Sequence, residues 1–166
     1  AARKAIRSLQ DEPRLRIEAG PASCTTYMAM NLTRAPLDRR EVRKALALAL
    51  DRSGIVTHMY HGRARLAAGI LPPLHWAFHG DLSPPPFDRE GAERLLDQAG
   101  LPRDPETGIR MTLTLKVTTD RFRTAVGRIL ADQLAAVGVE VETVPTELST
   151  LLSDVRQGNF DLYVLQ

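Results

Sequence analysis

The chain has 166 residues, a length that fits one domain with a substantial buried core. Its 43% hydrophobic and 25% charged residues are ordinary globular values, and a formal net charge of +2 gives no strong field that would attract a polyanion to the whole surface. No apolar run approaches the roughly 18 residues of a membrane-spanning helix, and the single cysteine, Cys24, cannot form an internal disulfide.

The first third of the chain contains short predicted elements. Residues 1–13 have the pattern of a short amphipathic helix, and the alternation of apolar and polar residues in RLRIEAG (14–20) predicts a half-buried strand. TTYMAMNL (25–32) predicts a second strand, covered on both faces. Cys24, which precedes this strand, is interpreted as a small core residue.

A helix with one basic and one apolar side is predicted over residues 39–50. Asp38 followed three residues later by Glu41 has the spacing of a capping box, and Asp51 is placed to cap a second, short helix that ends at Gly62. The basic side carries Arg40, Arg43 and Lys44, and the apolar side carries Val42, Ala45, Leu46, Leu48, Ala49 and Leu50.

Residues 63–87 form a long Pro-rich arm that contains the only tryptophan, Trp76. A connection of this length in a compact domain usually has a function or packs as an ordered arm. Asp88 is then predicted to cap a helix, and Gly100 supplies the left-handed residue that ends it.

The last third of the chain alternates strands and helices. The predicted order is strand 111–117, helix 120–138, strand 139–144, helix 146–158 and strand 159–166. A β-α-β-α-β order implies right-handed crossovers and at least partly parallel pairing, so the predicted fold class is α/β, with a mixed sheet and flanking helices. Because the sequence stops inside the last predicted strand, we expect it to be a piece of a longer protein.

The basic side of helix 39–50 supports an alternative hypothesis, a DNA-binding regulator that uses this helix. Its basic residues could contact phosphates, and the following short helix could imitate a helix-turn-helix. Acidic residues interrupt the cluster, however, and the apolar side leaves no polar row to contact base edges. The pattern favours a solvated helix face, and no nucleic-acid partner is expected.

Metal and catalytic chemistry have no motif in this sequence. The histidines form two pairs, His58 with His61 and His75 with His79, but no cysteine pair or helical H-E-x-x-H completes a zinc site. Neither a G-x-S-x-G turn nor a Gly-rich phosphate loop is present. We expect no metal, no cofactor and no enzymatic activity.

A ligand cleft is expected at the carboxyl ends of the strands, where open α/β sheets hold their ligands. Trp76 in the arm and the loop TTDRFR after strand 111–117 would line it. Arg121 or Arg123 of that loop could pair with a carboxylate through two hydrogen bonds. The alternatives stay open at this point: Trp76 could instead plug the arm onto the core, and both arginines could be solvated.

Taken in order, five segments resemble the extracytoplasmic solute-binding proteins of ABC importers, the peptide- and nickel-binding type called family 5. The family pattern has an aromatic, a strand that ends in Asn, P-L-D-x-x-x-V-R and A-x-D-R-like helix motifs, a Pro-Pro and Trp arm, and a final G-x-F-D strand. The corresponding segments are YMAMNLTRAPLDRREVRKALALALDRSGIV, GRARLAAGILPPLHWAF, FDREGAERLLDQAGL, ILADQLAAVGVEVETV and GNFDLYVLQ.

The resemblance implies one lobe of a type II periplasmic-binding-protein-like fold, with residues 1–166 as a single lobe and the arm 63–87 within it. The implied function is to bind an oligopeptide or another small polar solute between two lobes and to deliver it to the membrane subunits of an ABC permease. It also implies a periplasmic or extracytoplasmic parent, lipid-anchored or free, whose signal peptide and second lobe lie outside this sequence. Arg121 and Arg123 lie near the basic residue of the family's peptide binders, but their register differs.

Overall fold

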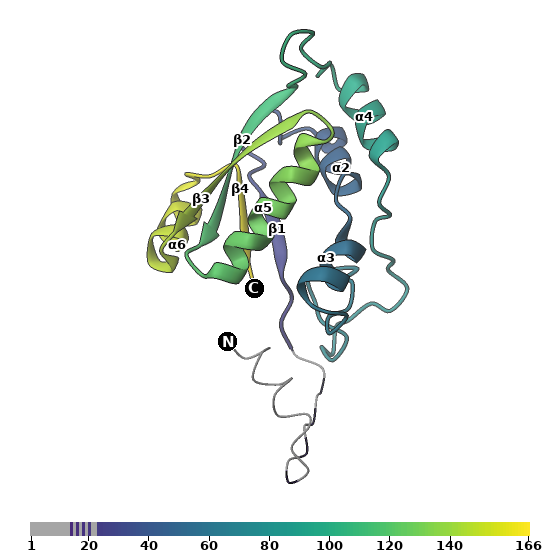
Figure 1. Cartoon of the computed structure of the whole chain (residues 1–166), viewed down its shortest axis with the longest axis vertical. Coiled ribbons are helices and arrows are strands. Elements are labelled where there is room, and N and C mark those ends of the chain that lie inside the picture. The colour runs from purple at the N-terminus through teal and green to yellow at the C-terminus, as the bar shows by residue number, and fades with distance from the viewer. Residues whose placement is uncertain (1–13, 15, 17, 19, 21–22) are drawn as a thin grey trace.

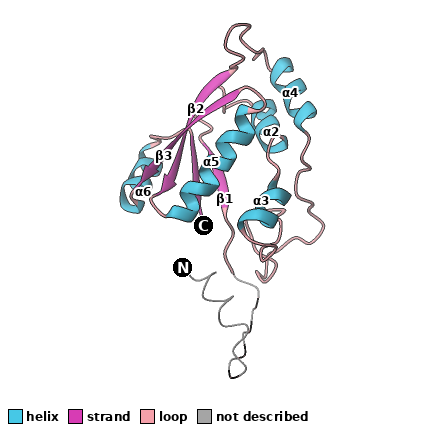
Figure 2. Ribbon diagram, viewed as in Figure 1, coloured by secondary structure: helices cyan, strands magenta, loops and turns pink. Residues whose placement is uncertain are grey.

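The computed structural model describes residues 14, 16, 18, 20 and 23–166, and these form one mixed sheet flanked by helices (Figures 1 and 2). The predicted helix over 1–13 and most of the predicted strand over 14–20 lie outside the described residues. The strands are β1 (Tyr27–Met30), β2 (Met111–Thr118), β3 (Val139–Thr146) and β4 (Leu162–Leu165). The helices are α2 (Arg40–Leu48), α3 (Arg52–Met59), α4 (Arg89–Gln98), α5 (Arg121–Ala135) and α6 (Leu148–Gln157).

The sheet order is β1-β4-β2-β3, with β2 parallel to both β3 and β4 and β1 antiparallel to β4. The predicted mixed, partly parallel sheet is therefore confirmed. Because the crossovers β2-α5-β3 and β3-α6-β4 run in opposite directions along the sheet, right-handed connections put α5 and α6 on opposite faces. In Figure 1, α5 lies in front of the sheet and α6 behind it.

The core lies between the sheet and the helices on the α5 side. The apolar side predicted for helix 39–50 is confirmed, since Val42, Ala45 and Leu46 of α2 are fully buried. Helix α4 packs against α2, and α5 packs against β3 and β2. The largest fully buried side chains of the cluster include Leu46, Leu96, Leu115, Leu134 and Leu162.

Aspartates begin three of the helices. Asp51, Asp88 and Asp120 each accept hydrogen bonds from backbone N–H groups in the first turn of α3, α4 and α5, as predicted for the first two. The cap predicted at Asp38 is wrong, because α2 begins after Arg39 and has no side-chain cap. Residues 34–39 already turn through backbone hydrogen bonds, from Asp38 N to Arg34 O and from Arg39 N to Pro36 O, which moves the helix start beyond Asp38.

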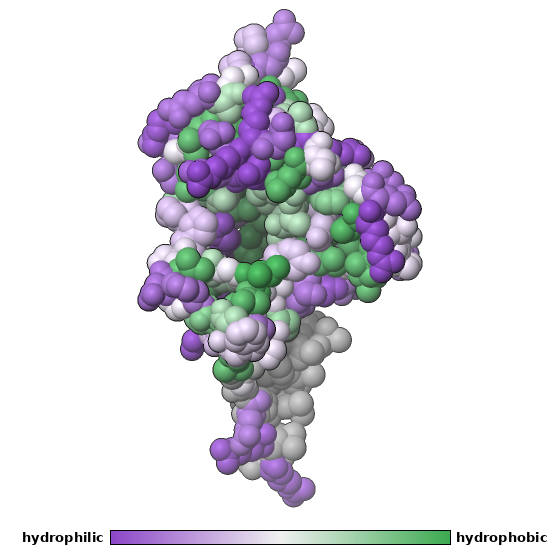
Figure 3. Space-filling model, turned by 180° about the vertical axis from the view of Figure 1, so that it is seen from behind, coloured by the Kyte–Doolittle hydropathy of each residue, from purple (hydrophilic) through white to green (hydrophobic). Residues whose placement is uncertain are grey.

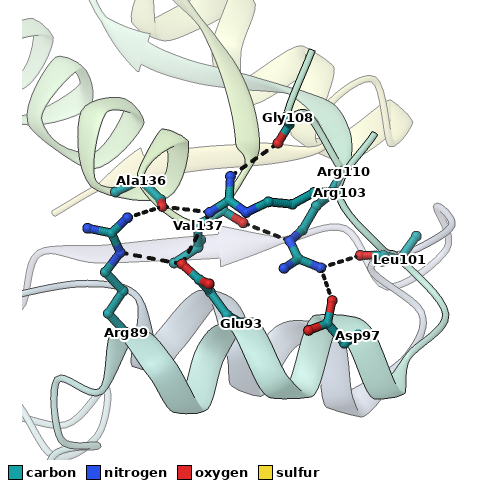
Figure 4. Close-up of polar contacts among 9 residues, drawn as sticks. All are labelled: Arg89, Glu93, Asp97, Leu101, Arg103, Gly108, Arg110, Ala136 and Val137. Atoms are coloured by element: carbon teal, nitrogen blue, oxygen red, sulfur yellow. Dashed lines mark hydrogen bonds and ion pairs between the residues drawn. The ribbon is translucent and has the colours of Figure 1, made fainter. Parts of the chain in front are cut away.

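Arg110, just before β2, joins α4 to the sheet. Its side chain is only 3% exposed, and it forms an ion pair with Asp97 of α4 (Figure 4). Its Nε also donates to Val137 O at 3.1 Å, and its Nη1 donates to Leu101 O at 2.6 Å. A buried guanidinium is tolerated here because carbonyl and carboxylate oxygens surround it.

Two further arginines bind the same turn between α5 and β3. Arg89 and Arg103 both donate to Ala136 O, at 2.6 and 2.9 Å, and both pair with Glu93 (Figure 4). A carbonyl at a helix C-terminus receives no hydrogen bond from an N–H group of the helix and carries partial negative charge. It therefore accepts hydrogen bonds from a guanidinium readily. We call Arg89, Arg103 and Arg110 the amino-end cluster, because they lie where the parallel strands β2 and β3 begin.

The Pro-rich arm contains no helix or strand, but hydrogen bonds near both of its ends join it to α2 and α3. Near its start, Gly62 N donates to Val56 O, and at its end Asp88 N donates to Leu48 O at 2.9 Å. Arg52 of α3 also donates to Pro85 O. Among the described residues no helix has the length and apolar character needed to cross a bilayer.

Candidate ligand-binding edge

The carboxyl ends of β2, β3 and β4 lie at one edge of the sheet, as parallel pairing requires (Figure 1). We call Thr118, Thr119, Thr146, Glu147 and Gln166, which end or follow these strands, the carboxyl edge. Helix α5 begins there, and the arm lies at the same end of the molecule (Figure 1). The ring of Tyr60, just before the arm, contacts that of Phe122 in the first turn of α5, edge to face at 5.1 Å.

Arg123 is held at the carboxyl edge. Asp120 caps α5 by accepting from the backbone N–H groups of Phe122 and Arg123, which fixes the helix start. The guanidinium of the half-buried Arg123 donates to Thr118 Oγ1 at 3.4 Å and to Gln166 Oε1 at 3.3 Å. These bonds are long for N–H···O contacts, so the guanidinium is positioned without being strongly bound.

Arg121 differs from Arg123, although the sequence analysis treats them as equivalent candidates. Its side chain is exposed, and among the described residues no hydrogen bond or ion pair of that side chain is seen. A residue two positions away on a helix points about 200° around the axis. The structure therefore brings Arg123 to the edge residues and leaves Arg121 beside them in solvent.

Glu147 is a charged residue of the edge that the sequence analysis missed as a candidate. It follows β3, begins α6 without capping it, and accepts a hydrogen bond from Thr119 Oγ1 at 3.4 Å. An acidic residue directly after a strand and before a helix was the available signal, but acidic residues are so common at helix N-termini that this signal does not distinguish Glu147 from a structural residue.

Trp76 does not plug the arm onto the core, because it is 92% exposed. It stacks on His75 with ring centroids 5.6 Å apart, in a short turn where His75 N donates to Pro72 O and Phe78 N donates to His75 O. The alternative in which Trp76 plugs the arm onto the core is therefore wrong. The arm also exposes Leu66, Ile70, Leu74, Leu82 and Phe87.

Two shallow hollows lie along the arm. One, of about 140 Å³, is lined mainly by Leu66 and the prolines 84–86 together with Arg52, whose pKa is lowered from its usual value by burial. The other, of about 190 Å³, lies within the arm between Ile70 and Leu82. Viewed from behind, the described surface has a hollow bordered by both apolar and polar residues (Figure 3). Neither arm hollow includes a residue of the carboxyl edge.

Cys24 is exposed, so its interpretation as a core residue is wrong; the strand that it precedes starts at Tyr27, two residues later than predicted. Its Sγ accepts from Gln166 Nε2 at 3.2 Å. Within the part of the chain that the structure describes, no three histidine, cysteine or acidic side chains converge as metal ligands.

The basic side of α2 is partly committed to intramolecular contacts. Arg43 donates to Leu37 O at 2.9 Å and to Asp38 O at 2.8 Å, and Arg39 donates to Ala99 O at 2.7 Å. Guanidinium groups that hold their own backbone carbonyls are less available for phosphates. The DNA-binding alternative therefore gains no support from this helix.

A family profile matches nearly the whole chain, and it describes bacterial extracellular solute-binding proteins, family 5 Middle, over residues 2–166. A dipeptide-binding protein of Pseudomonas aeruginosa is 27% identical over 156 residues, which are 94% of this chain and 29% of that protein. The probable ABC transporter periplasmic-binding protein SapA of Escherichia coli is 32% identical over 146 residues, covering 84% of this chain and 25% of SapA.

Solved structures show the same fold. The structure of the oligopeptide-binding protein AppA from Bacillus subtilis, in complex with a nonapeptide, superposes with a TM-score of 0.87 at 25% identity. The superposition covers 98% of this chain and 34% of AppA. The sequence thus spans about a third or less of the length of the relatives it matches.

Proposed function

The chain belongs to the bacterial extracellular solute-binding proteins of family 5, and from that premise we propose that it is one lobe of the solute-binding component of an ABC importer. The observation that carries the proposal is the family match over residues 2–166, joined to an α/β sheet whose carboxyl edge presents polar side chains. The proposed solute is an oligopeptide or another small polar molecule. No enzymatic step is proposed.

The proposed mechanism is a hinged clamp formed by this lobe and a second lobe of the same parent protein. Strands β1 and β4 are antiparallel neighbours, with Tyr27 opposite Leu165, so the start of β1 and the end of β4 lie side by side. Two adjacent connections of this kind permit one rigid body to rotate against another. Closure would exclude water from the carboxyl edge and strengthen the polar contacts to a bound solute.

Three residues are proposed to contact the solute. Arg123 would pair with a carboxylate, since its present hydrogen bonds to Thr118 and Gln166 are long and go to neutral oxygens. Arg121 would add positive charge from solvent, and Trp76 would offer an exposed aromatic surface. The parent is proposed to act outside the cytoplasm, where it would deliver the solute to the permease subunits.

Calorimetry tests this function directly. We expect the full-length parent protein to bind short peptides and residues 1–166 alone to bind them weakly or undetectably, because one lobe offers half of the contacts while the association entropy is undiminished. Nanomolar binding by residues 1–166 alone would contradict the two-lobe mechanism. A parent protein that binds no member of a peptide panel would contradict the peptide assignment.

A further inference from the structure

We propose that the Pro-rich arm, residues 63–87, packs against the second lobe of the parent protein through its apolar side chains, and that it does so before any solute binds. The inference rests on the proposed function, which supplies the second lobe. It adds an interface that the hinged clamp by itself does not require, because a clamp needs only its connections and the solute to hold the lobes together. Trp76 remains assigned to the solute.

The arm is rich in large apolar side chains that take no part in the core of this lobe. Ile70 is 65% exposed, Leu74 is 63% exposed and Leu82 is 55% exposed. No residue of the arm belongs to the core cluster of the described residues. Soluble proteins seldom leave an apolar surface of this kind in water, and such a patch usually marks an interaction site.

The middle of the arm keeps its shape through its own contacts. His75 N donates to Pro72 O, and Phe78 N donates to His75 O, both at 2.9 Å. Among the described residues, the hydrogen bonds that join the arm to the helices all lie near its two ends. The middle of the arm is therefore a small projecting unit, and this lobe leaves its apolar side chains uncovered.

A hollow of about 190 Å³ lies within this apolar surface, between Ile70 and Leu82. Leu71 and Phe78 are among the other residues that line it. An apolar cavity of about 150 Å³ is large enough to bind benzene. The hollow can therefore receive one large apolar side chain, such as a leucine or a phenylalanine, from the surface that covers the arm.

The position of the arm points to the second lobe as that covering surface. Figure 1 shows the arm at the end of the molecule where β1 begins and β4 ends, which is where the proposed clamp has its connections. The superposition on AppA covers 98% of this chain but only 34% of AppA. Nearly all of the arm thus has a counterpart in a protein about three times as long, whose remaining length is available to cover it.

The contact is expected in the solute-free protein as well. If the arm met the second lobe only on closure, its apolar side chains would be exposed to water whenever the lobes opened, at a cost that grows with the exposed area. A contact that persists through opening and closing avoids this cost. The rotation of the lobes would then be accommodated where the arm joins α3 and α4.

The test measures how readily a cysteine at position 82 of the full-length, solute-free protein reacts with iodoacetamide. Leu82→Cys is a small change at a surface position, and mass spectrometry assigns the alkylation to this cysteine even if the parent protein has others. We expect the reaction to be at least about tenfold slower than in the same protein unfolded in urea, because a covered thiol reacts only when the interface opens.

A second substitution shows whether the apolar surface of the arm causes this protection. Ile70→Ser in the Leu82→Cys protein should speed the reaction about tenfold, since it replaces an apolar contact of the interface by a hydroxyl group. The matched control is Leu148→Ser at the start of α6, because Leu148 is 50% exposed but lies outside the arm. It should leave the rate unchanged.

Three results would contradict the interface with the second lobe. The reaction could be as fast as in the unfolded protein, it could slow only after a peptide is added, which would show a contact made on closure, or it could slow as the protein concentration rises, which would show that a second copy covers the arm. The measurement needs no solute. A protein that protects the arm but binds no peptide would therefore refute the peptide assignment and support this interface.

Discussion

Arginines lie beside both ends of helix α5, but the hydrogen bonds that they form differ between the two ends. In the amino-end cluster, Arg89 and Arg103 bind the Ala136 carbonyl and Arg110 binds the Val137 carbonyl, at 2.6–3.1 Å. At the carboxyl edge, Arg123 has contacts of 3.3 and 3.4 Å to side-chain oxygens only. The first group of arginines holds the fold together, and the second arginine remains available.

The polarity of a helix explains the difference. The carbonyls of Ala136 and Val137, directly after the last turn of α5, have no partners within the helix and attract guanidinium groups. The first turn presents N–H groups instead, and Asp120 accepts from two of them. At this end of the helix Arg123 has no unpaired backbone carbonyl to bind. Its guanidinium can therefore pair with a ligand without giving up a contact that stabilises the fold.

The largest expected effect is the loss of Arg110. Arg110→Leu should lower the free energy of unfolding by about 3 kcal/mol, because the Val137 and Leu101 carbonyls lose a buried donor and Asp97 loses its ion-pair partner. Urea unfolding followed by circular dichroism measures the change. Arg110→Lys, which keeps the charge but not the fork of donors, should lose less; a loss below about 1 kcal/mol for Leu would show that the cluster is not structural.

A smaller effect is expected from the cap at the other end of α5. Asp120→Ala should lower the free energy of unfolding by about 1 kcal/mol, since two N–H groups of the first turn lose their acceptor. The same urea experiment detects it, with Asp120→Asn as a control that retains a capping oxygen. Equal losses for Ala and Asn would mean that the negative charge, and not the hydrogen bonds, stabilises this helix start.

A substitution of Arg123 should affect peptide binding but not stability. Arg123→Gln should change the free energy of unfolding by less than about 0.5 kcal/mol, because it removes only long hydrogen bonds to neutral side-chain oxygens, but it should weaken peptide binding by the full-length protein. The matched substitution Arg128→Gln, at an exposed position of the same helix, should affect neither quantity. If Arg123→Gln destabilises as strongly as the change at Arg110, the contrast between the two ends of α5 is wrong.

The smallest effect concerns the turn between α4 and β2, next to the amino-end cluster. The pKa of Asp104 is lowered because its carboxylate accepts hydrogen bonds from Thr107 and from the backbone of Glu106. A lowered pKa means that this contribution to stability is present above the unfolded-state value of about 3.9 and is lost as the pH falls through the folded-state value. The difference in urea midpoint between the wild type and Asp104→Asn should therefore stay constant at neutral pH and shrink as the pH falls below about 4, and a difference that does not change there would contradict this.

Local chemistry was enough to predict several elements from the sequence. The apolar side of α2, the caps at Asp51 and Asp88 and the left-handed Gly100, with φ of 72°, all follow from residues within one or two turns of each other. The order of strands and helices in the last third likewise predicted at least partly parallel pairing, and β2 pairs with β3 in parallel. Asp38 was mistaken for a cap because the spacing of a capping box does not reveal competing backbone turns.

The candidate site was only partly predictable from the sequence, because its residues contact partners that are far away along the chain. The sequence indicated that the loop after β2 would lie at the ligand edge, and it offered Arg121 and Arg123 without distinguishing them. The choice of Arg123 depends on Gln166, which is 43 residues away in the sequence. Glu147 could not be selected because its neighbour Thr119 is 28 residues away and reaches it only through the pairing of β2 with β3.

The sequence by itself determined which of the described segments are helices and strands, the fold class and the family, since these depend on periodicity, caps and the order of motifs along the chain. Tertiary structure alone decided which charges are used up and which remain available. Arg110 is satisfied and Arg123 is not because the direction of α5 puts carbonyls beside the one and N–H groups beside the other, and that direction in space is fixed by the packing of the helix on the sheet.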